Sequence, residues 1–170
     1  MIKAHKIRLH PRPEQATYFA KAAGTARYAF NWAVAEWKRQ YEAGEKPSAL
    51  KLRTQFHALR KQQLPWTYDV TKCAIEGAFM DVAAAFKNFF EGGKAGRKTG
   101  FPQFKSKKRS HQSFYLANDK FTVGDRLPRR AQAWPSEYGG EVALQRPYPV
   151  RSHLQNGLLV VRLDYGRDAR

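Results

Sequence analysis

One segment in the middle of the chain concentrates positive charge around aromatic residues. No acid lies between Lys94 and Arg109, and Phe101, Pro102 and Phe104 interrupt the run of cations. Cations neutralise phosphates and aromatic rings offer flat faces to unpaired bases, so this composition is typical of a nucleic-acid-binding surface. The alternative is a solvated loop whose two phenylalanines only anchor it to the core. The cations of this basic loop are Lys94, Arg97, Lys98, Lys105, Lys107, Lys108 and Arg109.

A second group of cations falls on one face of a helix predicted to begin at Ser48. Apolar residues recur there at helical spacing, which predicts one buried face and one charged face. Tyr115, in a strand predicted after the basic loop, is a third aromatic residue able to stack on a base. The cations of this helix are Lys51, Arg53, Arg60 and Lys61.

Few residues suggest catalysis or a metal ion. Cys73 is the single cysteine, which excludes a four-cysteine zinc site and a disulfide scaffold. Ser136 and His153 lack the context of a nucleophile elbow. We therefore expect no catalytic residue, no metal and no cofactor.

The composition is that of a folded, strongly basic protein. The chain has 170 residues, with 31 Lys and Arg against 14 Asp and Glu, and a net charge of +17. A hydrophobic content of 42% argues against disorder, and the length suits one domain or two small lobes. The charge implies a polyanionic partner. No apolar run approaches the roughly 18 residues of a membrane span, so we expect a cytoplasmic protein, associated with the nucleoid if it binds DNA.

Hydrophobic spacing predicts an α+β fold. Alternation over residues 2–9 indicates a strand, and loose alternation over residues 113–123 indicates a hairpin. Between them, about four helices form a bundle inserted between the strands, with Phe86 and Trp32 buried between the helices. These helices cover residues 14–23 and 25–43, a third segment that Ser48 caps, and a fourth from Thr71 to the pair Gly92 and Gly93.

Three motifs resemble a known family. Pro13-Glu14-Gln15 follows a basic strand, residues 26–33 read ARYAFNWA, and residues 101–108 read FPQFKSKK. Together they resemble the OrfB/TnpB family of insertion-sequence transposon proteins, which is related to compact type V CRISPR effectors. The resemblance covers residues 1–127.

The resemblance implies a small, incomplete β-barrel with an inserted helical recognition part. Residues 1–12 and 99–127 would form the barrel and residues 13–93 the helical part. In the family this region holds a guide RNA and the target DNA duplex, and a RuvC-type nuclease follows it. The converging carboxylates of that nuclease and the family's zinc ribbon are not recognisable here, so we expect a truncated, nuclease-free fragment.

The residues from 128 onward form an atypical tail. All 11 phenylalanines lie at or before Phe121, and every lysine lies at or before Lys120. A shifted reading frame would change the composition in this way, and codons for residues 138–170 can be chosen so that the shifted frame restores the missing residue types. We expect this tail to pack poorly, although residues 154–163 are β-prone and could form a strand.

Four functions remain open at this point. The leading hypothesis is a nuclease-free, transposon-encoded protein that binds a guide-like RNA, duplex DNA or both. The second is an independent helix-turn-helix DNA-binding regulator, whose recognition helix would carry Arg53, Gln55 and His57. A metal-dependent nuclease and an inert, poorly folded product are the others.

Overall fold

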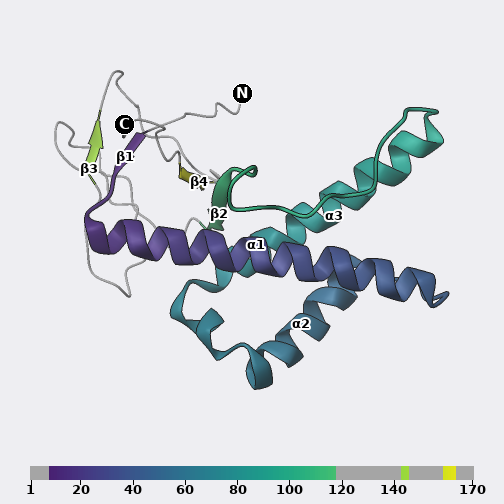
Figure 1. The fold of residues 1–170 in the computed structure, drawn as a ribbon, viewed down its shortest axis with the longest axis horizontal. Helices are drawn as coiled ribbons and strands as arrows, with labels where there is room; N and C mark the ends of the chain where they lie inside the picture. The colour runs from purple at the N-terminus through teal and green to yellow at the C-terminus, as the bar shows by residue number, and fades with distance from the viewer. Residues whose placement is uncertain (1–7, 118–142, 146–158, 164–170) are drawn as a thin grey trace.

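The computed structural model of the chain describes residues 8–117, 143–145 and 159–163. This part is mostly helical, and a long first helix crosses in front of the third (Figure 1). The elements in chain order are β1 (Arg8–His10), α1 (Pro13–Glu42), α2 (Ala49–Gln63), the 3₁₀ helix η1 (Pro65–Asp69), α3 (Lys72–Lys94), β2 (Gln112–Leu116), β3 (Ala143–Gln145) and β4 (Leu159–Leu163).

Helix α1 is continuous where the sequence predicts two helices. The expected break at Gly24 is absent, and α1 runs for 30 residues. A glycine inside a helix costs only about 1 kcal/mol relative to alanine, and the alanines around it favour the helix. Thr25, where the second helix was expected to begin, donates its hydroxyl to the carbonyl oxygen of Lys21 one turn earlier, at 3.0 Å. The prediction of a turn here was wrong because glycine alone does not end a helix.

The predicted starts of the two shorter helices are confirmed. The Ser48 hydroxyl accepts a hydrogen bond from the backbone N–H of Lys51 at 3.3 Å, at the start of α2. The Thr71 hydroxyl accepts one from the N–H of Cys73 at 3.3 Å, at the start of α3. The N–H of Thr71 itself donates to the Tyr18 hydroxyl at 3.0 Å. This last bond fixes the start of α3 against α1.

Aromatic rings fill the space between the three helices. Trp37 of α1 stacks on Phe86 of α3, with ring centroids 3.8 Å apart. Phe56 of α2 is fully buried and meets Phe79 of α3 and Trp32 of α1 edge to face, at 5.6 and 5.1 Å. The predicted burial of Phe86 is confirmed. Trp32 is only partly buried, because it lies where the core opens to the surface.

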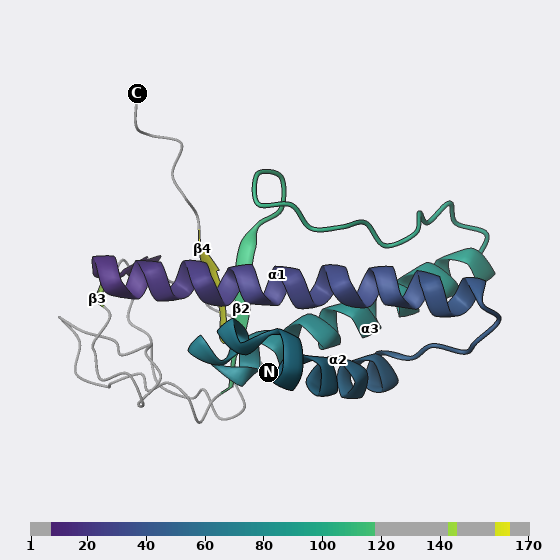
Figure 2. The same ribbon diagram turned by 60° about the horizontal axis from the view of Figure 1, so that its bottom comes forward.

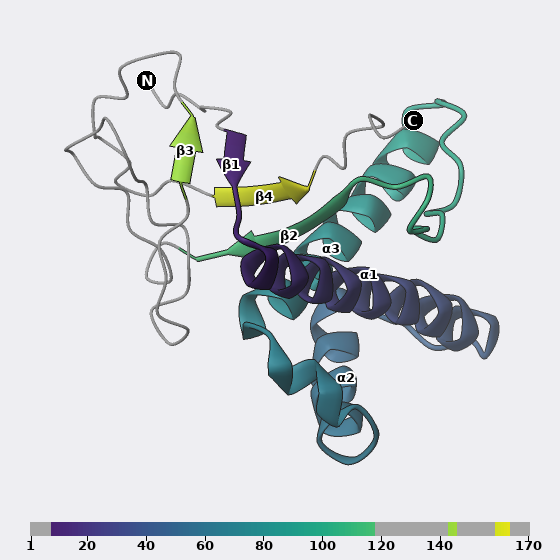
Figure 3. The same cartoon turned by 60° about the vertical axis from the view of Figure 1, so that its left-hand side comes forward.

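The predicted bundle of four helices inserted in a β-barrel is wrong. The described residues form three α-helices, because the first two predicted helices merge. Their strands are three to five residues long and form two separate antiparallel pairs, β1 with β3 and β2 with β4 (Figure 3). Each strand has a single partner in these pairs, so they do not close into a barrel. Helix α3 also extends beyond the predicted stop at Gly92 and Gly93, and ends at Lys94 before Gly96, whose φ is +68°.

The strand pairs involve the C-terminal segment. Strand β2 confirms the start of the predicted strand at residue 113, and its Phe114 lies opposite Val161 of β4. The strand expected within residues 154–163 is thus confirmed as β4. The rest of the predicted hairpin, and the packing of most of the tail, lie outside the described residues. The proposed boundaries between barrel, helical part and tail stay predictions.

Gly77 allows β2 to lie across α3. A Cβ atom added at this glycine would lie 2.4 Å from the Cβ of Tyr115, far inside van der Waals contact. We therefore expect Gly77→Ala to lower the free energy of unfolding by about 1–3 kcal/mol through overpacking. Urea unfolding measures it, with Gly93→Ala, where a Cβ would meet nothing within 4 Å, as the control. Equal stabilities of the two variants would contradict this close packing.

Candidate nucleic-acid interface

The basic loop runs back along the helical bundle after α3 (Figure 2). Phe101 fastens its first half, because its ring packs edge to face on Phe86 and Phe89 of α3, with centroids 5.4 and 5.7 Å apart. The role of a core anchor, which the sequence left open for both phenylalanines, therefore fits Phe101. The ring of Phe104, in contrast, is 63% exposed.

Asn31 of α1 holds the second half of the loop. Its side-chain amide donates to the carbonyl oxygen of Lys105 at 2.9 Å, and its side-chain oxygen accepts from the N–H of Lys105 at 2.8 Å. The amide of Asn31 thus satisfies both the N–H and the C=O of Lys105, as a residue on a neighbouring β-strand would, and so fixes the position of the loop. A loop tied at two points loses less freedom when a ligand binds.

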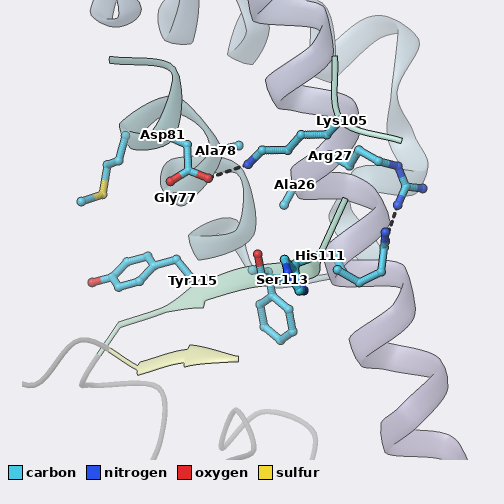
Figure 4. A pocket seen from close by; sticks show the side chains of 13 residues that line it. Ala26, Arg27, Gly77, Ala78, Asp81, Lys105, His111, Ser113 and Tyr115 are labelled. Carbon is cyan, nitrogen blue, oxygen red and sulfur yellow. Dashed lines mark hydrogen bonds and ion pairs between the residues drawn. The ribbon is translucent and has the colours of Figure 1, made fainter. Parts of the chain in front are cut away.

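The side chain of Lys105 is used within the protein. Its Nζ donates to Asp81 of α3 at 2.7 Å, as Figure 4 shows, and lies 4.2 Å from the centroid of the Phe30 ring. The ammonium group therefore already has an anionic and an aromatic partner. Lys105 is better placed to hold the loop than to contact a phosphate.

The other six cations of the basic loop are exposed. A turn over residues 106–110 presents the last three: the N–H of Arg109 donates to the Ser106 hydroxyl at 3.0 Å, and the N–H of Ser110 donates to the Ser106 carbonyl at 3.0 Å. Within the described part of the chain, none of the six has an acidic partner within 4.0 Å. Their charge is therefore available to an external anion. The six are Lys94, Arg97, Lys98, Lys107, Lys108 and Arg109.

The predicted cationic face of α2 loses Arg60. This side chain is buried, and its guanidinium donates at 2.7 Å to both the hydroxyl and the carbonyl oxygen of Thr67, while lying 3.8 Å from the Tyr68 ring centroid. It fastens α2 to η1. The expectation of an exposed Arg60 was wrong, because η1, which follows α2, supplies hydrogen-bond acceptors that bring this side chain into the interior. Lys51, Arg53 and Lys61 are exposed.

The two groups of cations do not form one surface. In both Figure 1 and Figure 2 the basic loop and α2 lie on opposite sides of α1. The basic loop carries six exposed cations in two groups, at residues 94–98 and 107–109, whereas α2 carries three. Tyr115 of β2 is half-buried against α3 beside Gly77, so of the three predicted stacking residues only Phe104 presents most of its ring to solvent.

Sequence reasoning missed two exposed aromatic residues beside Phe104. Tyr28 of α1 is 40% exposed, and Trp66 of η1 is 44% exposed. Both line one groove with Phe104. The signal was weak, because Tyr28 lies at helical spacing with buried residues of α1 and Trp66 lies in a short segment between two helices.

Breaking the Asn31 tether tests how the loop is positioned. We expect Asn31→Leu to lower the free energy of unfolding by about 1–3 kcal/mol, since two hydrogen bonds are lost at a part-buried site. Proteolysis within residues 102–110 should also become faster, because the loop no longer has a fixed backbone contact. Limited proteolysis read by mass spectrometry measures this. Unchanged cleavage would mean that other contacts hold the loop.

Two properties of the described ranges bear on function. No group of three or more His, Cys, Asp or Glu side chains lies close enough to hold a metal ion in those ranges. No helix there is both long and apolar enough to cross a bilayer.

Comparisons with known proteins agree with the resemblance found in the sequence. Residues 1–46 match the family model HTH_OrfB_IS605, described as a helix-turn-helix domain. The matched residues that the structure describes form β1 and one continuous helix. The chain is also 27% identical over 108 residues to the "Putative RNA-guided DNA endonuclease InsQ" of Escherichia coli (strain K12). That match covers 62% of this chain and 26% of InsQ, so it spans about a quarter of the relative.

Proposed function

We propose that this chain, whose N-terminal part is an OrfB/TnpB region, binds nucleic acid through the exposed cations of the basic loop and has no nuclease activity of its own. The observation that carries the proposal is the set of six exposed loop cations, held in place by Phe101 and Asn31. A fixed array of unpaired cations attracts the phosphate backbone regardless of base sequence.

RNA is the ligand that we place first. A relative named as an RNA-guided DNA endonuclease supports this choice. We expect a structured, guide-like RNA to bind more tightly than duplex DNA of equal length, because looped RNA offers unpaired bases as well as phosphates. We expect a protein with such a ligand in the cytoplasm.

The test is a salt titration of binding to structured RNA and duplex DNA. We expect log K to fall steeply and linearly with log salt for both, with a slope of about −0.7 to −0.9 per phosphate contact. A flat dependence, or no binding at about 50 mM salt, would refute the proposed function.

A second experiment addresses the nuclease. Purified protein with Mg²⁺ or Mn²⁺ and RNA should leave DNA intact, because the sequence shows no carboxylate set of the RuvC kind. Metal-dependent cleavage that survives repurification, and is lost when an acid of this chain is replaced, would overturn this part of the proposal.

An independent helix-turn-helix regulator is the competing function, and α2 would be its recognition helix. Arg53 and His57 are exposed on α2, but Gln55 already accepts a hydrogen bond from Gln40 at 2.8 Å. Burial, together with the charges of Arg60 and Arg53, lowers the pKa of His57, so this ring stays neutral near pH 7. A regulator of this kind would prefer one duplex sequence over others, whereas the proposed function predicts near-equal binding of all duplexes.

A further inference from the structure

An open groove crosses α1 between the basic loop and η1. Its volume is about 780 Å³, within the range of ligand-binding sites. Phe104 of the loop and Trp66 and Asp69 of η1 line it, and α1 contributes the rest of the described lining. We call it the aromatic groove; its rings are Tyr28, Trp32, Trp66 and Phe104, and Lys21 and Arg27 are the cations that line it.

Three of the four rings of the aromatic groove, Tyr28, Trp32 and Trp66, pack against other aromatic rings. Buried Phe56 meets Trp32 at 5.1 Å and Tyr28 at 6.4 Å, so the core supports both α1 rings. Tyr28 in turn meets Trp66 edge to face, with centroids 5.3 Å apart. Rings fixed in this way pay little entropy when a flat partner stacks on them.

The charge around the aromatic groove favours an anionic occupant. Lys21 and Arg27 line it, and Phe104 is followed within five residues by the exposed turn of Lys107, Lys108 and Arg109. Asp69 also lines the groove, but its carboxylate lies 3.9 Å from the ammonium of Lys21. An apolar peptide would use the rings but leave the exposed cations of the turn, Lys107, Lys108 and Arg109, without an anionic partner. A nucleotide strand uses both.

We propose that the aromatic groove binds unpaired bases of a single-stranded nucleic acid by stacking, while the turn of the basic loop holds the adjoining phosphates. This inference rests on the proposed function and adds to it the bases as a second source of affinity. Duplex DNA cannot enter the groove in this way, because its bases already stack on one another. The groove thus gives the site a preference for unpaired strands.

The test compares two oligonucleotides of equal length and charge, one of oligothymidylate and one abasic throughout. We expect the full chain to bind the base-containing strand more tightly, by about tenfold per stacked base. Phe104→Ala should remove a large share of this ratio. Replacing Lys107 and Lys108 by alanine should weaken binding of both strands equally, because phosphates are common to them.

Gly24 offers a variant that fills the groove and keeps every ring and cation. It lies in the groove, and a Cβ added there would meet only the Nη2 of Arg27, at 4.0 Å. Gly24→Leu should therefore fold and bring the ratio of the two affinities to within about twofold of one, by excluding the bases. Gly24→Ala is the matched control and should keep most of the ratio, because a methyl group occupies little of the groove.

Three results would contradict the stacking site, and they differ in what they imply for the proposed function. A wild-type ratio near one at measurable affinity would overturn the stacking site and leave the proposed function standing, with the groove free for a protein partner. A Gly24→Leu variant that melts like Gly24→Ala and keeps the wild-type ratio would place the stacking elsewhere and overturn the assignment. Failure of wild type to bind either strand at about 50 mM salt would overturn both proposals.

Discussion

Replacing Lys107, Lys108 and Arg109 together by alanine weakens nucleic-acid binding by about two orders of magnitude at about 0.1 M salt. Each phosphate contact contributes about 0.7–0.9 to the slope of log K against log salt, so three lost contacts reduce the slope by about 2–3. The three side chains are exposed on one turn, and the backbone bonds of that turn to Ser106 do not involve them. The loss is therefore electrostatic and falls on all sequences alike.

A second triple variant controls for net charge. Lys38, Arg39 and Lys87 are exposed cations already paired with acids on their own helices, at 3.7, 2.6 and 3.8 Å. Replacing all three by alanine removes the same charge from outside the basic loop, and we expect the slope to change by less than one contact. Equal losses in the two triple variants would mean that net charge, rather than the loop, determines binding.

Replacing Phe86 by alanine lowers the free energy of unfolding by about 3–5 kcal/mol, a large share of the stability of a domain this size. Phe86 is 1% exposed, stacks on Trp37 and receives Phe101 of the basic loop on its edge. Its removal leaves a cavity that three elements share, and none of them can close it alone.

Denaturant unfolding of Phe86→Ala measures this loss, with Phe104→Ala as the matched control. The same atoms are removed in both variants, but the Phe104 ring is 63% exposed and we expect a change within about 1 kcal/mol. A small shift for Phe86→Ala would show that α1 and α3 do not pack through this ring. Because Phe101 rests on Phe86, the variant should also loosen the basic loop.

The sequence predicted correctly those features that depend only on residues close together in the chain. Ser48 was predicted as a helix cap and Thr71 as the start of a helix, and both side chains accept a backbone N–H at those positions. A cap depends on residues within one turn, so it can be recognised without knowing the fold. The exposure of the basic loop cations follows from a run without acids or apolar spacing, which is also a local property.

The predictions that were wrong concern features that depend on contacts with residues elsewhere in the chain. The helix break at Gly24 was predicted from propensity, but packing of the alanine-rich face of α1 against α3 favours a continuous helix. Arg60 was assigned to the surface because its acceptors on Thr67 come from a turn whose shape the sequence does not reveal. The sequence does not distinguish Lys105 from the other cations of the basic loop, because its ion-pair partner, Asp81, lies 24 residues earlier.

The family resemblance was a better guide to the region than to its fold. It identified the OrfB/TnpB region, which the match over residues 1–46 supports. The barrel that it implied was wrong for the described residues, where β1 and β2 each pair with a short strand from the C-terminal segment. Strand pairing over so long a separation is set by the whole chain rather than by local sequence.

The central claim, that the exposed cations of the basic loop contact nucleic acid, is tested most directly by labelling the lysines of the full chain with and without bound RNA. Mass spectrometry then gives the labelling rate of each lysine. The account predicts strong protection of Lys98, Lys107 and Lys108 by RNA, no change at Lys38 and Lys87, and loss of that protection at high salt. Equal labelling of the loop lysines with and without bound RNA would contradict it.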